Sequence, residues 1–208
     1  MQSPNTHGLM ARELKRTPAV EVRWCKMLGD ARPNRFDASK PHQWGVDIVL
    51  DSQEKEHLEW IEAVEAEFAL QHGEQVRKSN NWNPVRPDKT QLAERGQPQR
   101  FYVAKFTLNQ MRRRDGTTSE GPTIFDKDGR AWDHSKLIGN GSKMVIGYEI
   151  YAWPDKGTGA GLSLNCLAGQ VTEWLEAPAL ARTSAADFGF NQAAGLETAA
   201  GGNDGFPF

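Results

Sequence analysis

The chain has 208 residues, of which 38% are hydrophobic, and its formal net charge is −2. This length accommodates one sizeable domain with an appendage rather than two full domains. No apolar run is long enough to span a membrane, and residues 1–5 lack the apolar stretch of a signal peptide, so we expect a soluble protein. The only two cysteines, Cys25 and Cys166, have no neighbour at metal-ligand spacing, and we expect both to be reduced thiols.

Charge is strongly segregated along the chain. Residues 76–114 contain ten basic and two acidic side chains, whereas residues 53–74 contain seven glutamates and one lysine. A protein that binds a polyanion needs one such attractive face, while the rest of its surface keeps it soluble. The alternative is that both runs are merely solvated loop and helix surfaces, and charge alone does not separate the two interpretations.

The N-terminal third begins with an irregular segment and continues with a strand. Residues 1–17 are polar and aperiodic, which predicts a flexible arm. Residues 18–28 alternate between apolar and polar side chains, with Val20, Val22 and Trp24 on one face, and this pattern predicts a half-buried strand.

A second strand and the one helix follow. Residues 44–50 alternate again, with Trp44 on the same side as the aliphatic positions. Asp51 is a suitable helix N-cap because Glu54, three residues later, completes a capping box, and Gly73 is expected to end the helix. The apolar positions at helical spacing are Leu58, Ile61, Val64 and Phe68.

The second half of the chain is dominated by strand signals. Residues 79–99 are rich in proline, asparagine and charge, and predict a long loop. The other expected elements are a strand at 100–109, a hairpin at 122–132 turning at 127–129, and strands at 143–153 and 162–175 joined by a glycine-rich loop at 154–161.

The expected fold is mainly β, with five or six strands and one inserted amphipathic helix. Closing such a meander removes its exposed edges, which favours a small barrel, although an open sandwich is the alternative. We assign residues 18–176 to this domain. Residues 177–208 are rich in alanine and glycine and cannot bury enough apolar surface to fold alone, so we expect a disordered tail.

Aromatic side chains accompany the basic run, the combination that binds unpaired nucleic acid by stacking bases and pairing with phosphates. On the strand at 100–109, Tyr102 and Phe106 share one face, and Phe101 and Lys105 share the other, but the sequence does not tell which face is exposed. The alternative is that these rings belong to the core. The candidates for nucleic-acid contact are Arg32, Arg35, Trp44, Arg77, Lys78, Trp82, Arg86, Lys89, Arg100, Phe101, Lys105, Arg112, Arg113, Arg114 and Lys143, with Trp44, Trp82 and Phe101 as stacking platforms.

No pattern for catalysis or cofactor binding emerges. The glycine-rich stretches at 138–143 and 157–161 lack the phosphate-loop and dinucleotide fingerprints and are expected to be turns. The aspartates within 126–133 lack the closing glutamate of a calcium loop, and the histidines are scattered. We therefore expect no metal, no cofactor and no enzymatic activity.

Three short motifs stand out: the step Gly139-Asn140-Gly141-Ser142 before a strand, the closing strand from Gly161 to Val171, and the step at 122–126. Together they resemble bacteriophage single-stranded DNA-binding proteins of the podophage replication type. In that family a G-x-G-S step opens a strand, as at 139–142, and the closing strand has the form seen from Gly161 to Val171. The step at 122–126, proline followed by apolar residues and aspartate, is also similar. The resemblance implies an OB-fold, binding to unpaired DNA, and an acidic C-terminal tail that contacts replication proteins such as DNA polymerase. Asp204, Phe206 and Phe208 match such a tail ending, although this tail has only three acids.

These observations predict a non-enzymatic protein that coats and protects single-stranded DNA, without sequence preference, during phage replication or recombination. We expect it in the cytoplasm of the infected bacterium, away from membranes, with a homo-oligomer left open. The principal alternative is a virion or assembly β-barrel whose basic loop binds a partner protein. A weaker one is a nuclease or recombination enzyme whose acidic residues are not recognisable in the sequence.

Overall fold

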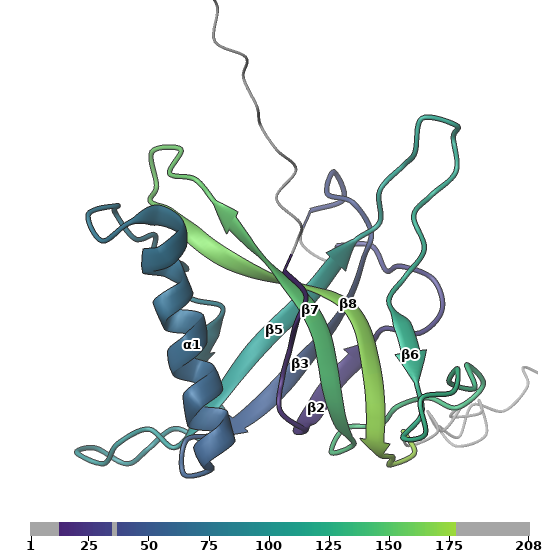
Figure 1. Cartoon of the computed structure of the whole chain (residues 1–208), viewed down its shortest axis with the longest axis horizontal. Coiled ribbons are helices and arrows are strands. Elements are labelled where there is room, and N and C mark those ends of the chain that lie inside the picture. The colour runs from purple at the N-terminus through teal and green to yellow at the C-terminus, as the bar shows by residue number, and fades with distance from the viewer. Residues whose placement is uncertain (1–12, 35–36, 178–208) are drawn as a thin grey trace, which may run out of the picture. The chain divides into compact units, whose positions relative to one another are not determined.

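The computed structural model describes residues 13–34 and 37–177 (Figure 1). These residues form eight strands and one helix. In chain order these are β1 (Lys15–Arg16), β2 (Val20–Lys26), β3 (Gln43–Asp51), α1 (Lys55–His72), β4 (Val85–Pro87), β5 (Phe101–Asn109), β6 (Thr123–Phe125), β7 (Lys143–Trp153) and β8 (Gly161–Glu173).

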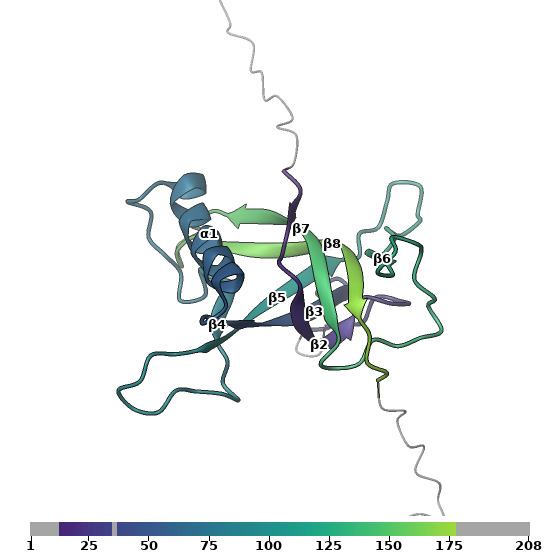
Figure 2. The same ribbon diagram turned by 60° about the horizontal axis from the view of Figure 1, so that its bottom comes forward.

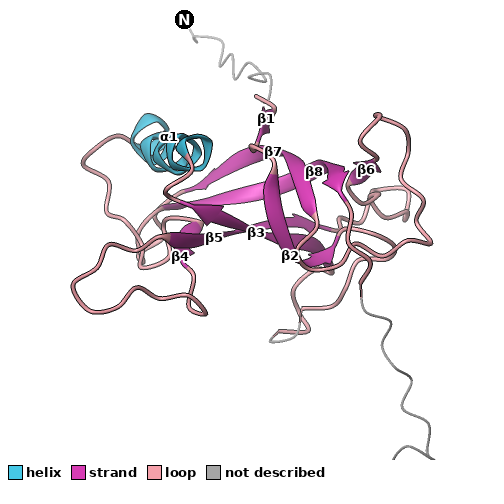
Figure 3. Ribbon diagram, turned by 90° about the horizontal axis from the view of Figure 1, so that it is seen from below, coloured by secondary structure: helices cyan, strands magenta, loops and turns pink. Residues whose placement is uncertain are grey.

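Five of these strands close into a barrel, in the order β7-β2-β3-β5-β8, with β8 pairing back onto β7. All pairs are antiparallel except β5 with β8, which run parallel. The short strands lie at the edges: β1 on β7, β4 on β5 and β6 on β8 (Figure 3). A closed five-stranded barrel of this kind is the architecture of an OB-fold, so the expected OB-like barrel with one inserted helix is confirmed.

Alternation along the strands produces the core. Trp44, Val46, Ile48 and Leu50 of β3 are all buried, as predicted. The three aliphatic side chains meet inward-facing side chains of β2, β7 and β8 in one cluster. Because successive side chains of a strand point to opposite faces, the intervening residues of the same strands form the outer surface of the barrel.

Helix α1 supplies aromatic and aliphatic side chains to the barrel core. Trp60, Ile61 and Val64 join the main cluster, and Phe68 lies in a smaller cluster with Ala160 and Leu162. The helix therefore packs along β3 and β7 at one side of the barrel (Figure 2). Its glutamates are mainly exposed. Gly73 ends it, as predicted, with a φ of 80°.

The predicted start of the helix is wrong. The helix begins at Lys55, Glu54 is its N-cap residue, and no side chain caps it. Asp51 is instead the last residue of β3, and its carboxylate accepts hydrogen bonds from the Arg100 guanidinium and the Gln53 backbone N–H. This carboxylate, which would have capped the helix, is taken up by the ion pair with Arg100.

Both predicted hairpins are confirmed. The chain reverses between Asp126 and Arg130, where Gly129 has a φ of 79° that a residue without a Cβ adopts freely. Strands β7 and β8 pair from Lys143 and Glu173 at one end to Trp153 and Gly161 at the other, where the loop at 154–160 joins them.

Two segments predicted to be irregular contain short strands. The expected loop at 79–99 includes β4, because Arg86 and its neighbours pair with β5. In the expected arm, β1 and Thr17 pair with β7, and the Thr17 hydroxyl accepts the Ile146 N–H. Residues 1–12 of that arm and the expected tail at 178–208 lie outside the described residues.

One buried hydrogen bond joins α1 to the barrel and gives a stability test. The Trp60 indole N–H donates to the Tyr148 hydroxyl over 2.9 Å, and both side chains are buried. Tyr148→Phe leaves that N–H without an acceptor, so we expect a loss of about 1–3 kcal/mol in the free energy of unfolding. Urea denaturation measures this loss. The control is Tyr151→Phe at a residue that is 55% exposed, and equal stability of the two variants would contradict the prediction.

Candidate nucleic-acid interface

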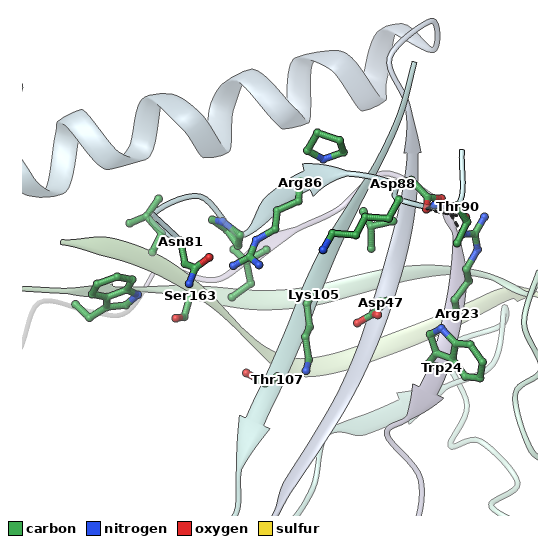
Figure 4. Close-up of a pocket in the computed structure, with 17 residues that line it drawn as sticks. Arg23, Trp24, Asp47, Asn81, Arg86, Asp88, Thr90, Lys105, Thr107 and Ser163 are labelled. Carbon is green, nitrogen blue, oxygen red and sulfur yellow. Dashed lines mark hydrogen bonds and ion pairs between the residues drawn. The ribbon is translucent and has the colours of Figure 1, made fainter. Parts of the chain in front are cut away.

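A long groove crosses the outer face of β2, β3 and β5. It consists of two adjoining cavities of about 570 Å³ and about 550 Å³. One end lies at Asn81 and Ser163, and the other at Arg32 and Gln43. Figure 4 shows the first cavity, with Asn81 and Ser163 at one side and Trp24 at the other. The two cavities share Trp24, Asp47, Lys105 and Thr107, which makes them one continuous groove.

The most exposed aromatic side chain of the groove is Trp24. Alternation predicts that it points inward with Val20 and Val22, but the structure shows it 64% exposed. The register of β2 against β3 shifts between Arg23 and Lys26, and Trp24 adopts a φ of 52°. Bulged residues leave the regular alternation of a strand, which is why this prediction is wrong.

The bulge is held by a specific contact. The Trp24 backbone N–H donates to the Asn140 side-chain oxygen over 2.8 Å. A positive φ is costly for a bulky residue with a Cβ, and such conformations persist only where the surroundings enforce them. The protein therefore accepts local strain to present a tryptophan ring at its surface.

Several basic side chains line the same two cavities as this ring. Arg86 of β4, Lys89 of the following loop and Lys105 of β5 line the first cavity, and Arg32 lines the second. Within the described residues, Arg86, Lys89 and Arg32 form no ion pair. These cations are therefore available to an anionic ligand.

Arg23 has a different role. It donates to Asp88 over 2.8 Å and to Glu21 over 3.2 Å. Asp88 is 3% exposed. Burial by itself would raise the pKa of Asp88, but hydrogen bonds from Thr90 and Arg23 hold this pKa below its ordinary value. Removing one partner of such a pair leaves a buried charge, so Arg23 fixes the loop after β4 rather than serving a ligand.

Asp47 is an acidic residue on the floor of the groove. It lies directly between Arg23 of β2 and Lys105 of β5 in the strand register. Burial raises the pKa of Asp47 above its ordinary value, and Lys105 and Lys26 lower it by less. The ionised form is therefore less favourable in the folded protein than in water.

The structure brings only part of the predicted site together. Trp44 is 3% exposed and donates its indole N–H to the Gly29 carbonyl, so its burial removes it as an exposed stacking platform, although its edge reaches the second cavity. Arg35 lies outside the described residues. The candidates that line the groove are Arg32, Trp44, Arg86, Lys89 and Lys105.

The remaining candidates do not line the groove, and several are paired. Lys78 lies over the Trp82 ring at 3.9 Å, next to the smaller core cluster. Arg77 forms an ion pair with Asp155, and Lys143 forms one with Glu173. Arg100 forms an ion pair with Asp51 and lies over the Phe101 ring. Arg112, Arg113 and Arg114 are exposed on the loop between β5 and β6.

Sequence reasoning missed several residues that line the groove. Trp153 is one, and its ring lies against Gly161, where any Cβ would overlap it. Gly161 opens the closing strand that carries part of the family resemblance, and this glycine is the signal that could have pointed to its neighbour Trp153. The others are Arg23, Trp24, Lys26, Asn81, Thr107 and Ser163.

Other site types find no support within residues 13–34 and 37–177. No group of three or more His, Cys, Asp or Glu there could hold a metal ion. No helix in the same ranges is long and apolar enough to cross a membrane. Both cysteines are free, and burial raises the pKa of Cys25 to about 11 and that of Cys166 to about 12.

The raised pKa of Asp47 gives a testable effect on stability. Because ionisation is less favourable in the folded state, Asp47→Asn removes a cost that is present at neutral pH. We expect a higher Tm at about pH 7, by up to roughly 2–4 °C for an effect of about 1 kcal/mol in a domain of this size. The gain should shrink as the pH falls through the raised pKa towards the ordinary one, where wild-type Asp47 is also neutral. A gain that is constant from pH 7 to about pH 4 would contradict this assignment.

Comparison with known proteins adds information at the level of the fold. No family model and no curated protein matches the chain in sequence. Gp2.5, a single-stranded DNA-binding protein encoded by bacteriophage T7, matches with a TM-score of 0.55 and 14% identity, over 83% of this chain and 98% of that chain. The single-stranded DNA-binding protein from bacteriophage Enc34, in complex with single-stranded DNA, matches with a TM-score of 0.56 and 9% identity over 79% and 88%. The C-terminal truncation of the Enc34 protein matches with a TM-score of 0.58 and 8% identity, over 79% of this chain and 87% of that chain. The structural neighbours are thus phage single-stranded DNA-binding proteins, and the expected resemblance is confirmed for the fold.

Proposed function

We propose that this protein binds single-stranded DNA in the groove over β2, β3 and β5, without catalysis and without sequence preference. The observation that carries the proposal is Trp24, a 64% exposed ring fixed on a strained bulge among cationic side chains. Bases of unpaired strands stack on such rings, while lysine and arginine follow the phosphates.

The shape of the groove supports a strand rather than a compact ligand. Two cavities in series, open at Asn81 and at Arg32, give an extended path across the barrel. OB-folds bind oligonucleotides on the face of their second and third barrel strands, which are β3 and β5 here. Solved proteins of similar fold include the phage single-stranded DNA-binding proteins described above, one of them in complex with single-stranded DNA.

We also propose the more specific role that the sequence suggests, in which the protein coats and protects unpaired DNA during phage replication or recombination in the infected cell. Recruitment of a replication protein through Asp204, Phe206 and Phe208 is part of this proposal. Those residues lie outside the described part of the chain, so the support is their match to the family's tail ending.

The groove is tested with Trp24→Ala. We expect affinity for oligothymidylate to fall about 5- to 150-fold, because losing one stacked base costs about 1–3 kcal/mol. The Tm should be unchanged, since the ring is mostly exposed. The measurement is a fluorescence-anisotropy titration at several salt concentrations. For wild-type protein, about four phosphate contacts should give a slope of log affinity on log salt near −3, from about −0.7 per phosphate.

Two further variants separate stacking and charge from folding. Phe106→Leu alters a fully buried ring that does not line the groove, so it should lower the Tm and leave affinity nearly unchanged. Asp47→Asn removes a negative charge from the groove floor and should raise affinity about two- to tenfold, on the order of 1 kcal/mol. Wild-type protein with no affinity for the oligonucleotide, or with metal-dependent cleavage of it, would reject the proposed function.

The tail is tested by deleting residues 203–208. We expect the Tm to stay the same and DNA affinity to be equal or modestly higher, since the deletion removes an acidic and aromatic segment but no groove residue. Binding to a replication partner should be lost. Affinity capture from infected cells with both forms measures this, and an identical set of captured proteins would show that the segment recruits nothing.

A further inference from the structure

We propose that the bound strand continues beyond the groove, past Trp24, onto a second stacking site formed by Trp132 and Trp174. This inference rests on the proposed binding of single-stranded DNA. It adds a subsite on another side of the barrel, between the end of β8 and the segment that follows β6.

The two indoles line a cavity of about 310 Å³. Their ring centroids lie 6.2 Å apart, with the ring planes at 66°. Trp174 is 40% exposed and Trp132 is half-buried. Asp126 and Lys127, which also line the cavity, are held in place as well, because the Gln170 side-chain amide donates to their carbonyls over 3.3 Å and 3.2 Å. The cavity is therefore built from segments that are tied to one another.

Hydrogen bonds from the indole N–H groups fix both rings, so neither ring needs a further hydrogen-bond partner. The Trp132 indole N–H donates to the Lys136 carbonyl over 2.9 Å, and the Trp174 indole N–H donates to the Leu137 carbonyl over 3.0 Å. Each ring thus has its single polar atom satisfied inside the protein. What Trp174 presents to solvent is rigid π surface, and a rigid platform loses little conformational entropy when a base stacks on it.

The surroundings of the cavity suit a nucleotide. Lys136 lies 5.8 Å from the centre of the Trp174 ring, and Lys127 lines the same cavity, so two cations are near enough to meet phosphates. The carboxylates of Asp126 and Asp133 accept hydrogen bonds within their own turns. Asp133 also interacts electrostatically with Lys136, so this lysine is partly countered, whereas Lys127 forms no ion pair within the described residues.

The turn at 138–142 joins this cavity to the groove. Asn140 accepts the backbone N–H of Trp24, so one side of the turn borders the exposed ring in the groove. Gly141 lies against Leu175, the residue after Trp174, and would bring a Cβ within 3.0 Å of it. Leu137 and Leu175 are 61% and 53% exposed, so exposed apolar side chains lie next to this turn.

This continuity favours a strand over a separate protein ligand. Exposed apolar patches on a soluble protein usually mark a binding surface. A patch that contacts the proposed DNA groove through one turn, and that combines aromatic faces with lysines, is suited to the next bases of the same strand.

The test is the dependence of affinity on oligothymidylate length. For wild-type protein, affinity should rise in a first step as the groove fills and in a second step once the strand reaches Trp174. Trp174→Ala should retain the first step and reduce affinity for the long strands about 5- to 150-fold, the value of one stacked base. Trp174→Phe, which keeps an aromatic face but loses the N–H, should retain most of the second step.

The matched control is Leu70→Ala on α1, another exposed apolar side chain at 78% exposure, which should leave both steps intact. If Trp174→Ala binds short and long strands as wild type does, the second site is rejected while the proposed function stands. The second site is equally rejected if this variant loses only the capture of a partner protein. If wild-type protein binds no length of strand, the proposed function itself fails.

Discussion

The hydrogen bond between the Trp24 backbone N–H and the Asn140 side chain fixes the part of the barrel on which both proposed binding surfaces depend. In a regular strand Trp24 would follow Val20 and Val22 into the core. The bulge turns it outward at a φ of 52° and brings β2 against the turn that precedes β7. One contact therefore positions the aromatic wall of the groove and ties it to the turn that also lies against Leu175, the residue after Trp174.

Ion pairing, more than charge density along the chain, decides which basic residues an anionic strand can use. Residues 76–114 contain ten of the 25 basic residues and only two acids, yet Arg100 already binds Asp51 through two nitrogens. A phosphate must displace that carboxylate before Arg100 can contribute. Exposed ion pairs such as Lys143 with Glu173 contribute little to stability, so a phosphate can readily replace the carboxylate. The ion pair between Arg23 and buried Asp88 is costly to break, because breaking it leaves a buried charge. Arg86 and Lys89 face no such competition within the described residues.

The parts of the fold that follow from local periodicity were predictable, and those that depend on register were not. The alternation from Trp44 to Leu50 fixes its inward face, and Gly73 ends the helix, because both signals are contained in a few consecutive residues. The outward orientation of Trp24 depends on a hydrogen bond to Asn140, which is 116 positions away, and a pattern in the residues around Trp24 cannot predict so distant a partner. The assignment of Asp51 as a helix cap was wrong for the same reason, since the side chain that binds its carboxylate, Arg100, is 49 positions distant.

The groove contains two features that oppose stability and lie close together. Trp24 occupies a strained backbone conformation, and Asp47 is ionised where burial disfavours its charge. A barrel selected only for stability would retain neither, because glycine at the first position and asparagine at the second would relieve the cost. Their combination fits a surface that must bind a strand and release it again. In the proposed function, the ring would supply affinity through stacking, and the carboxylate that lies between Arg23 and Lys105 would limit how strongly the phosphates are held. Under the proposed role of coating DNA, the strand must later pass to the enzymes that copy it, and a groove of purely positive charge would oppose that release.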